Sequence, residues 1–360
     1  MTEVTVPWEA NGPVTLLCLP RAVDLRGVGL FHATFNILPA GLTMPTVTTI
    51  HDLMWLKPSW LSVQQSLWGR VQRAFYENGI RRALSKSTRI VTVSEATRED
   101  VRRICGACAT KTVTIQPSVH PDFLAQSVAE DESGVRQVST PSEKRYLLAI
   151  GQSAPYKNHG AVLRAFARVS RDHDLRLIMV HRLGDPNHLE RMAARLGIAS
   201  RVQFLREIPR MDLVRLYLGA LALCQPSLCE GFGLPILEAM ACGCPVITSP
   251  VASMPEIAGD AAIYIPPGND SALADAIVRV ATDLRLAASM RVLGRERVRR
   301  WPSWASHAEQ HVRLYRELLG WRGRRTIEPL PEVRTGVNAA ANIGSCSAEA
   351  PERSCGGGGA

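Results

Sequence analysis

Residues 146–169 read YLLAIGQSAPYKNHGAVLRAFARV, in which an apolar run is followed by a glycine-led turn and then by apolar residues at helical spacing. The run 146–150 predicts a buried strand, and the segment 161–169 predicts an amphipathic helix. The same alternation continues along the chain and predicts further strands at 175–180, 202–205, 221–225, 245–249 and 261–265. Strands that alternate with helices indicate a parallel sheet covered on both faces, which is a doubly wound α/β domain.

The first 140 residues show the same alternation in a thinner form. Strands are predicted at 14–19, 29–34, 46–50, 89–93 and 112–116, with long helices near 62–86 and 95–105. Segment 125–145 is polar and poor in large apolar residues, as expected for an exposed linker. We therefore predict an N-terminal domain over 1–140 and a C-terminal domain over 141–300. A further helix is expected within 301–322, whereas residues 323–360 have too little apolar content to fold and are predicted to be disordered.

The composition favours an ordinary globular protein, with 46% hydrophobic and 21% charged residues. No apolar run approaches the roughly 20 residues that cross a bilayer. The first residues lack the basic start and apolar core of a secretory signal. The nine cysteines, an odd number, do not suggest a disulfide framework and suit a reducing compartment. We expect a cytoplasmic protein.

Two short motifs have spacings that metal sites use, and neither predicts one. Cys105 and Cys108 lack the second pair or the histidines that a zinc site needs, so we expect structural or neutral cysteines. Asp172 and Asp174 have the D-x-D spacing that holds a divalent metal on a sugar diphosphate in a large class of sugar transferases. They precede the strand 175–180 and therefore lie at the amino end of the sheet, away from the ligand-binding edge. We assign no metal.

The formal charge of the chain is +9, and its densest basic patch is RVLGRERVRR, residues 291–300. Five arginines in such a patch could contact anionic lipid headgroups or nucleic acid. The alternative is a solvated helix face. Because no aromatic interleaving or nucleic-acid fold signature accompanies the patch, we expect no nucleic-acid partner. Peripheral contact with an anionic membrane stays open.

The stretch CEGFGLPILEAMACG, residues 229–243, lies between two of the predicted strands. Pro235 suits the first position of a helix, and Gly243 suits the position just past its end, so a short helix is predicted over 235–242. The start of this helix faces the carboxyl edge of the sheet. There it offers unpaired backbone N–H groups and the positive end of a helix dipole to an anion.

Two glutamates bracket this turn, with Glu230 before the helix and Glu238 in its first turn, and both are expected to face one crevice. Gly231 and Gly233 would let the backbone approach a ligand closely. Carboxylates accept hydrogen bonds from pairs of hydroxyls, so the arrangement suits a phosphate held between two polyols, which is the layout of a nucleotide-sugar. The alternative is that Glu238 only complements the helix dipole and that Glu230 is solvated.

Two other loops also follow predicted strands. GQSAPYKNHG, residues 151–160, places Lys157 at a helix start, where its ammonium would meet a phosphate, although the Walker pattern is absent. His51 follows the strand 46–50 and could bind a sugar hydroxyl or assist a proton movement. The alternative is a structural histidine that is hydrogen-bonded to Asp52 or to the backbone.

Together these residues resemble the retaining glycosyltransferases of family 4, which adopt the GT-B fold of two facing Rossmann-like domains. The match runs over residues 31–315. Its strongest part, PSLCEGFGLPILEAMACGCPVITSPVASMPEIAGDAAIY (226–264), follows the family's glutamate-x7-glutamate motif and the S-x-x-P-E loop after it. Weaker matches occur in the expected order: FHAT (31–34), TIHDLMWLKP (49–58), IVTVSEATREDV (90–101), GQSAPYKN (151–158) and the late Ser303-Trp304.

The resemblance implies a role for each residue that matches a family motif. Glu238 would bind the ribose of the nucleotide, and Glu230 would lie beside the donor sugar. Lys157 would neutralise the diphosphate, and His51 would reach the site from the acceptor side, so Glu230, His51 and Lys157 form the expected catalytic set. Donor contacts would come from Gly151, Lys157, Asn158, Glu230, Gly231, Phe232, Gly233, Leu234 and Glu238. Such enzymes resemble one another in needing no metal or other cofactor, because lysine and helix N-termini stabilise the leaving diphosphate.

The resemblance also implies a hexose transfer with retention of configuration. The T-I-H-D-L and P-Y-K-N variants are similar to branches that transfer mannose from GDP-mannose to a saccharide or lipid-linked acceptor in cell-envelope polysaccharide synthesis. The family normally has a strand, a glycine-rich loop and a helix before the F-H-A-T strand, whereas 30 residues precede Phe31 here. The N-terminal domain is therefore expected to be truncated, and the helix within 301–322 is expected to pack back on it. Two alternatives are a truncated, non-catalytic nucleotide-sugar-binding remnant and a related phosphorylase or epimerase.

Overall fold

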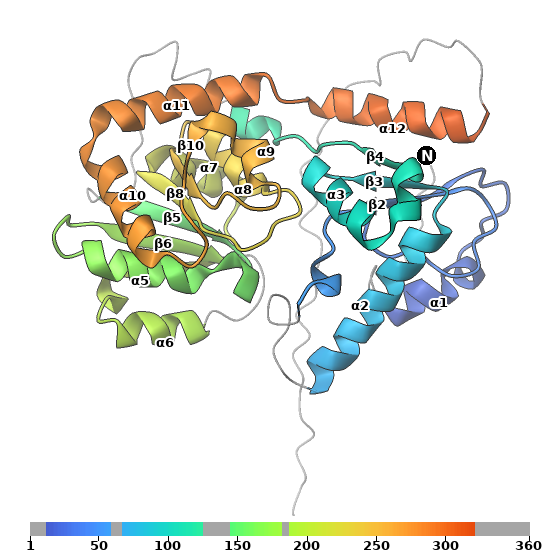
Figure 1. The fold of residues 1–360 in the computed structure, drawn as a ribbon, viewed down its shortest axis with the longest axis horizontal. Helices are drawn as coiled ribbons and strands as arrows, with labels where there is room; N and C mark the ends of the chain where they lie inside the picture. Colours follow the sequence, from blue (N-terminus) through green and yellow to red (C-terminus); the bar gives the residue numbers. More distant parts are fainter. Residues whose placement is uncertain (1–11, 59–66, 125–144, 182–186, 321–360) are drawn as a thin grey trace, which may run out of the picture. The chain divides into compact units, whose positions relative to one another are not determined.

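The structure is a computed structural model that describes residues 12–58, 67–124, 145–181 and 187–320. In these residues the strands form two parallel sheets, one of four strands and one of six (Figure 1). This confirms the predicted fold class of two Rossmann-like α/β units. The domain boundary near residue 140, most of the linker 125–145 and the tail 323–360 lie outside the described residues.

The six-stranded sheet is parallel throughout and is covered by helices on both faces (Figure 1). Its strands, in chain order, are β5 (Tyr146–Gly151), β6 (Arg176–His181), β7 (Val202–Arg206), β8 (Ala222–Gln225), β9 (Val246–Thr248) and β10 (Ala262–Tyr264). Its helices are α5 (His159–Val169), α6 (Asn187–Arg195), α7 (Arg210–Gly219), α8 (Leu234–Ala241), α9 (Met254–Ala258), α10 (Asp270–Thr282) and α11 (Leu284–Arg299). The spatial order is β10-β9-β8-β5-β6-β7, so the chain moves outward from β5 to β7 and then returns to place β8 on the other side of β5.

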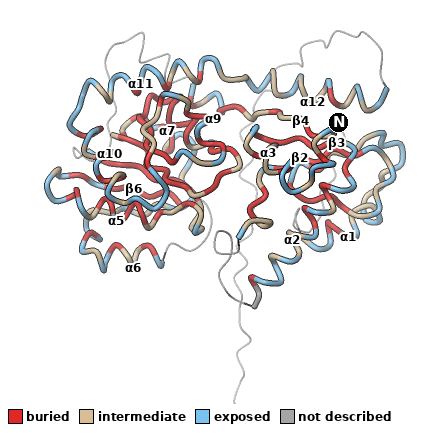
Figure 2. Tube along the Cα trace, in the orientation of Figure 1, coloured by how far each residue is buried: buried red, intermediate tan, exposed pale blue. Residues whose placement is uncertain are grey.

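Strand β5 is buried on both faces because it lies in the middle of this sheet. Leu148 and Ile150 pack in an apolar core with residues of α7 and α8. Leu147 and Ala149 point to the opposite face and pack with residues of α5 and α10. This is why β5 reads as a continuous apolar run rather than as an alternating one. Figure 2 shows the buried residues concentrated in the strands and on the inner faces of the helices.

The four-stranded sheet has the order β1-β2-β3-β4, and all of its strands are parallel. It consists of β1 (Phe31–Ala33), β2 (Thr46–Ile50), β3 (Arg89–Thr92) and β4 (Thr112–Thr114), with helices α1 (Pro13–Ala22), α2 (Leu67–Lys86) and α3 (Glu95–Ile104). Ile50, Ile80 and Ile90 are completely buried in its core.

Helix α12 (Trp304–Leu318) packs on the four-stranded sheet, although it follows the six-stranded sheet in the chain. Leu314 lies in an apolar cluster with Val47 and Val91. An Nη2 atom of Arg89 donates a hydrogen bond of 2.8 Å to Glu317. The end of the described chain is thus attached to the strands near its beginning.

The strand predicted over residues 14–19 is wrong, because these residues belong to helix α1. A short apolar run does not distinguish a strand from a helix, and Pro13 is well placed to begin a helix. The helix buries Thr15 and Leu16, whereas Leu17 is 61% exposed. A helix just before the F-H-A-T strand agrees with the family pattern described above.

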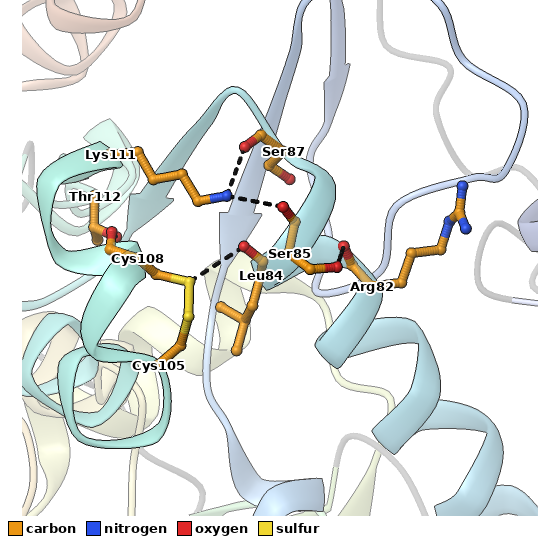
Figure 3. Close-up of a disulfide and its surroundings, with 8 residues drawn as sticks. All are labelled: Arg82, Leu84, Ser85, Ser87, Cys105, Cys108, Lys111 and Thr112. Atoms are coloured by element: carbon orange, nitrogen blue, oxygen red, sulfur yellow. Dashed lines mark hydrogen bonds between the residues drawn. A yellow bond between two sulfur atoms is a disulfide. The ribbon is translucent and has the colours of Figure 1, made fainter.

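Cys105 and Cys108 are joined by a disulfide at the end of α3, which the sequence analysis did not predict (Figure 3). An odd number of cysteines argues against a complete disulfide framework, but it does not exclude one local pair. The other cysteines in the described residues are free thiols. Beside the disulfide, Lys111 Nζ donates hydrogen bonds to the carbonyl oxygens of Ser85 and Ser87, which attaches this segment to the end of α2 (Figure 3).

The arginine patch 291–300 lies on α11 and the residue that follows it, and part of it is used inside the molecule. Arg291 donates a hydrogen bond of 2.7 Å to the carbonyl oxygen of Gly243, just past the end of α8. Arg297 donates to the carbonyl oxygens of Glu256 and Ile257 in α9. These arginines therefore satisfy carbonyl groups at helix ends, which the prediction of a solvated or membrane-facing patch did not anticipate.

Candidate functional site

The order in which strands are added to the six-stranded sheet changes direction between β5 and β8, which are parallel neighbours in that sheet. In open α/β sheets the crevice at such a reversal, outside the carboxyl ends of the strands, is where ligands bind. The loop after β5 contains Lys157, and the loop after β8 contains Glu230. The topology therefore brings together two loops that lie far apart in the sequence.

Lys157 and Glu230 form a buried ion pair at this point. Lys157 Nζ donates to Glu230 Oε1 over 2.7 Å, and the two side chains are 11% and 8% exposed. The same Oε1 accepts hydrogen bonds from Gln225 Nε2 at 3.0 Å and from Ser227 Oγ at 2.8 Å. Glu230 Oε2 accepts none from any residue that the structure describes. One oxygen of this carboxylate is thus saturated, and the other remains available to a hydroxyl group.

Gly151 makes room for the lysine. It has a φ of 151°, and a Cβ there would lie 3.1 Å from both Cδ and Cε of Lys157. Lys157 ends a 3-10 turn (Pro155–Lys157), and Asn158, in a left-handed conformation, directs the chain into α5. The Asn158 side chain donates to the carbonyl oxygen of Pro226 over 3.2 Å, which ties the first loop to the second.

The glycines of the second loop have separate roles. A Cβ on Gly231 would lie 1.7 Å from the carbonyl oxygen of His51, so no larger residue fits there without movement of the backbone. Gly233 has a φ of 101° and is the cap of α8, a conformation that favours glycine. Ser253 Oγ donates to the carbonyl oxygens of both Glu230 and Phe232, which fixes the loop.

Phe232 contributes to this loop mainly through its backbone, because its side chain is buried. The ring is 7% exposed and lies edge-on to Trp301, with 5.8 Å between the ring centroids. Leu234 begins α8, and its side chain is 36% exposed. Helix α8 therefore begins shortly after Glu230 in the sequence, and its first backbone N–H groups follow the glutamate of the ion pair.

Glu238 lies one residue further along α8 than predicted. Helix α8 begins at Leu234, so Glu238 is its fifth residue and not part of its first turn. Its Oε2 accepts a hydrogen bond of 2.9 Å from the Tyr217 hydroxyl. Glu238 and Leu234 line a cavity of about 470 Å³, whereas Glu230 is not among its lining residues. That both glutamates face one crevice stays a prediction.

His51 lies beside the loop that contains Gly231, through its own carbonyl oxygen. Its Nε2 is 2.8 Å from the carbonyl oxygen of Thr34, and its backbone N–H donates to Asn36. A carbonyl can only accept, so Nε2 is the ring nitrogen that donates in this contact. The bond to the backbone is the one that the structural alternative expected, and it leaves Nδ1 without a hydrogen-bond partner among the described residues.

The start of helix α3 contacts the same glycine loop, which the sequence analysis did not predict. Ser94 Oγ and Thr97 Oγ1 donate to the carbonyl oxygen of Gly231 over 2.6 and 3.0 Å. The Glu256 carboxylate accepts from the backbone N–H groups of Glu95 and Ala96 at 3.0 and 3.1 Å. The last two contacts join the segments 90–101 and 253–256, and nothing in either segment indicates that they meet.

Two histidines close to the Lys157 loop have little contact with solvent. His159 begins α5 and His181 ends β6, and their rings meet edge to face with centroids 5.4 Å apart. Burial lowers the pKa of His159 to about 3 and the pKa of His181 to about 4. Both rings are therefore neutral near pH 7, so they add no positive charge beside the lysine.

No cluster of three histidine, cysteine or acidic side chains suited to a metal ion occurs in the described residues. Asp174 is paired with Arg201 at 3.4 Å, in the turn before β6. Likewise, none of the helices described here combines the length and apolar content needed to cross a membrane.

The fold is shared with glycosyltransferases of known structure. Sucrose-phosphate synthase from Thermosynechococcus elongatus superposes with a TM-score of 0.66 at 24% identity, covering 81% of this chain and 74% of that one. The Anabaena HepE complex with UDP-glucose superposes with a TM-score of 0.62 at 18% identity, covering 76% and 72%. Two parallel-sheet α/β units with these relatives define the GT-B class.

Sequence comparison identifies the family. The profile described as Glycosyltransferase Family 4 matches residues 8–123, and the profile described as Glycosyl transferases group 1 matches residues 131–297. The chain belongs to this family of glycosyltransferases. One relative, the O-antigen chain mannosyltransferase B of Escherichia coli, is 29% identical over 292 residues, which cover 80% of this chain and 74% of the relative.

Proposed function

We propose that this glycosyltransferase moves mannose from GDP-mannose to a saccharide or lipid-linked acceptor, with retention of configuration, in cell-envelope polysaccharide synthesis. The observation that carries the proposal is the buried Lys157–Glu230 ion pair, which lies where the order of the strands changes direction. Helix α8, which begins shortly after Glu230, places Glu238 in a cavity. The name of the Escherichia coli relative supports the sugar and the product class. The UDP-glucose in the HepE structure supports a nucleotide-sugar donor.

Lys157 and the N-termini of α5 and α8 would hold the diphosphate. In the transfer, the bond between the anomeric carbon and the diphosphate oxygen breaks, and its electron pair stays on the diphosphate. The acceptor oxygen bonds to the anomeric carbon and loses its proton. Negative charge therefore grows on the diphosphate, where an ammonium and helix N-termini stabilise it without rearrangement. We propose that these groups supply the charge for which other transferases use a metal.

The two glutamates would hold the sugar and the ribose. Glu230 Oε1 is saturated by its three donors, so Oε2 is the atom that would accept a hydroxyl of the donor sugar. Glu238 would accept the ribose hydroxyls while Tyr217 fixes its carboxylate. Each carboxylate is held by protein donors before the ligand arrives, which lowers the entropy lost on binding.

His51 would act on the acceptor side. Because its Nε2–H is bonded to the carbonyl oxygen of Thr34, its Nδ1 is the acceptor nitrogen. An acceptor hydroxyl at Nδ1 could donate a hydrogen bond there and transfer its proton as it attacks. This orientation is set by the neighbouring backbone and needs no acidic partner.

A cytoplasmic location, with peripheral contact to the inner face of the membrane, is also part of the proposal, since lipid-linked acceptors lie at a membrane surface. Arg299 and Arg300 are the most exposed arginines of the basic patch, and Arg291 and Arg297 bind backbone carbonyls. Any attraction to anionic lipid by this patch would rest mainly on the exposed pair.

The test is a donor screen that follows release of the nucleoside diphosphate from GDP-mannose, UDP-glucose, UDP-N-acetylglucosamine and ADP-heptose in the presence of lipid-linked saccharide acceptors. GDP-mannose is expected to be turned over. Glu230→Ala should reduce the rate at least roughly 100-fold with the fold intact. Glu238→Ala should weaken donor binding roughly 10- to 100-fold, the loss expected for a hydrogen bond to a charged group. Glu296→Ala, which removes an exposed carboxylate on α11, is the matched control.

Three results would contradict the proposal. Turnover of another donor in place of GDP-mannose would refute the choice of sugar and nucleotide. Nucleotide binding without transfer to any acceptor would favour the non-catalytic remnant. Wild-type rates in the Glu230→Ala variant would show that the site has been placed wrongly.

A further inference from the structure

The cavity that Glu238 lines extends to the carboxyl ends of β6 and β7. Its lining includes Val180 from β6 and, just after β7, Glu207 and Ile208. The remaining lining residues come from the start of α7, from the start of α8, from α12 and from the segment after β4: Ser118, His120, Phe123, Arg210, Leu213, Leu234 and Trp304. If the ribose binds Glu238, as the proposed function requires, the attached base must enter this cavity.

The cavity is lined by both apolar and charged side chains. Val180, Ile208 and Leu213 provide apolar surface that suits the face of an aromatic base. Arg210 is already engaged, because it donates to His120 at 3.0 Å and to Asp122 at 3.3 Å. Glu207 has no hydrogen bond or ion pair with any residue that the structure describes. Apart from Glu238, which the ribose would occupy, Glu207 is therefore the charged side chain of this lining that is available for hydrogen bonds with the edge of a base.

The backbone at Glu207 is unusual for a glutamate. Its φ is 46°, one of four positive values at non-glycine residues in the described parts of the chain. Glycine, asparagine and aspartate adopt this conformation more readily than glutamate does. The strain gives a way to separate the side chain's role from the stability of the fold, because glycine at this position removes both the strain and the carboxylate.

We propose that Glu207 selects guanine over other bases, an inference that rests on the proposed function. An ionised carboxylate only accepts hydrogen bonds, and its two oxygens match two parallel N–H donors. Guanine offers such a pair in its N1–H and its 2-amino group. Uracil offers one N–H between two carbonyl oxygens, which a carboxylate would repel. Adenine offers a ring nitrogen that is itself an acceptor beside its amino group. Of these bases, guanine alone is complementary to the carboxylate.

The experiment measures dissociation constants of GDP, IDP and UDP by calorimetry for the wild type, for Glu207→Gln and for Glu207→Gly. IDP lacks only the 2-amino group. The wild type should prefer GDP to UDP, and to IDP, by about 10- to 100-fold, the range expected for losing part or all of a bidentate contact to a base. Both variants should bind GDP and IDP equally, with little change for UDP. Glu207→Gly should also melt at a higher temperature than the wild type, because the strain is relieved.

The control is Glu296→Gln, which should keep the wild-type preference because this exposed carboxylate does not line the cavity. A wild type that binds UDP at least as tightly as GDP would overturn the guanine assignment and leave a nucleotide-sugar transferase in place. Variants that lose GDP and UDP affinity equally would also overturn it, since the side chain would then not read the base. Failure of all three nucleotides to bind the wild type would instead refute the proposed function.

Discussion

Removing the charge of Lys157 should destabilise the protein, because its carboxylate partner is almost completely buried. The pair is 2.7 Å apart, and the two side chains are 11% and 8% exposed. Breaking a buried pair costs about 3–5 kcal/mol when one partner is left behind. Gln225 and Ser227 still donate to Glu230 in the Lys157→Met variant, so we expect the lower end, about 3 kcal/mol.

The double variant Lys157→Met/Glu230→Gln shows whether this cost comes from the pair. With both charges gone, no uncompensated charge stays buried, so the double variant should be less destabilised than the sum of the single variants by about 2 kcal/mol. The free energies of unfolding are measured by urea titration at pH 7.5, with tryptophan fluorescence as the signal. All three variants should be inactive in sugar transfer. The double variant should therefore recover part of the stability without recovering activity.

The matched control uses two exposed residues that the structure describes, Lys86→Met and Glu296→Gln, which lie on α2 and α11 and form no ion pair with each other. Their effects should be small and additive. A coupling below about 0.5 kcal/mol for the Lys157 and Glu230 variants would refute the reasoning, because it would mean that the two charges do not stabilise each other.

Two further predictions follow from close packing and from buried histidines. Gly231→Ala places a Cβ 1.7 Å from the His51 carbonyl oxygen and should lower the transfer rate at least roughly 100-fold, since a shift of about 1 Å in a catalytic loop has that effect. Gly106→Ala, with open space around its Cβ, should transfer sugar at the wild-type rate, and equal rates for both variants would contradict the packing argument. For His159, whose folded pKa is about 3, the unfolded chain takes up a proton below about pH 6.5 while the folded chain does not, so stability falls on acidification. Urea titrations should show a loss of about 2 kcal/mol from this residue between pH 7 and pH 5, absent in His159→Gln, and identical losses in both proteins would exclude His159 as the cause.

Much of the fold was predictable because its signals are local. Ten of the eleven strands predicted from apolar runs have a counterpart whose ends lie within two residues of the expected ones, and the run 14–19 is the exception. The run 14–19 was misassigned because six apolar or small residues satisfy either period, although Pro13 before them is a helix-start signal. Glu238 was placed one residue too early in α8, because the helix begins at Leu234 and not at the proline.

The candidate site was only partly predictable, because its contacts join residues that are distant in sequence. The motifs around Lys157 and Glu230 indicated two ligand-binding loops, yet the bond between them depends on β8 returning to the side of β5. The contact of Ser94 with the Gly231 carbonyl spans the two sheets, and no local pattern encodes it. The exposed Glu207 gave no signal at all, since a single charged residue after a strand is common.

Local sequence patterns encode the alternation of strands and helices, the glycine-rich turns and the residue types at the ends of the strands. These follow from periodicity and backbone preferences that act over a few residues. The tertiary structure alone decided which of those side chains meet: Lys157 with Glu230, Tyr217 with Glu238, and the Gly231 loop with His51 and α3. The reason is that strand order and close packing are set by burial of the whole core, which no short segment contains.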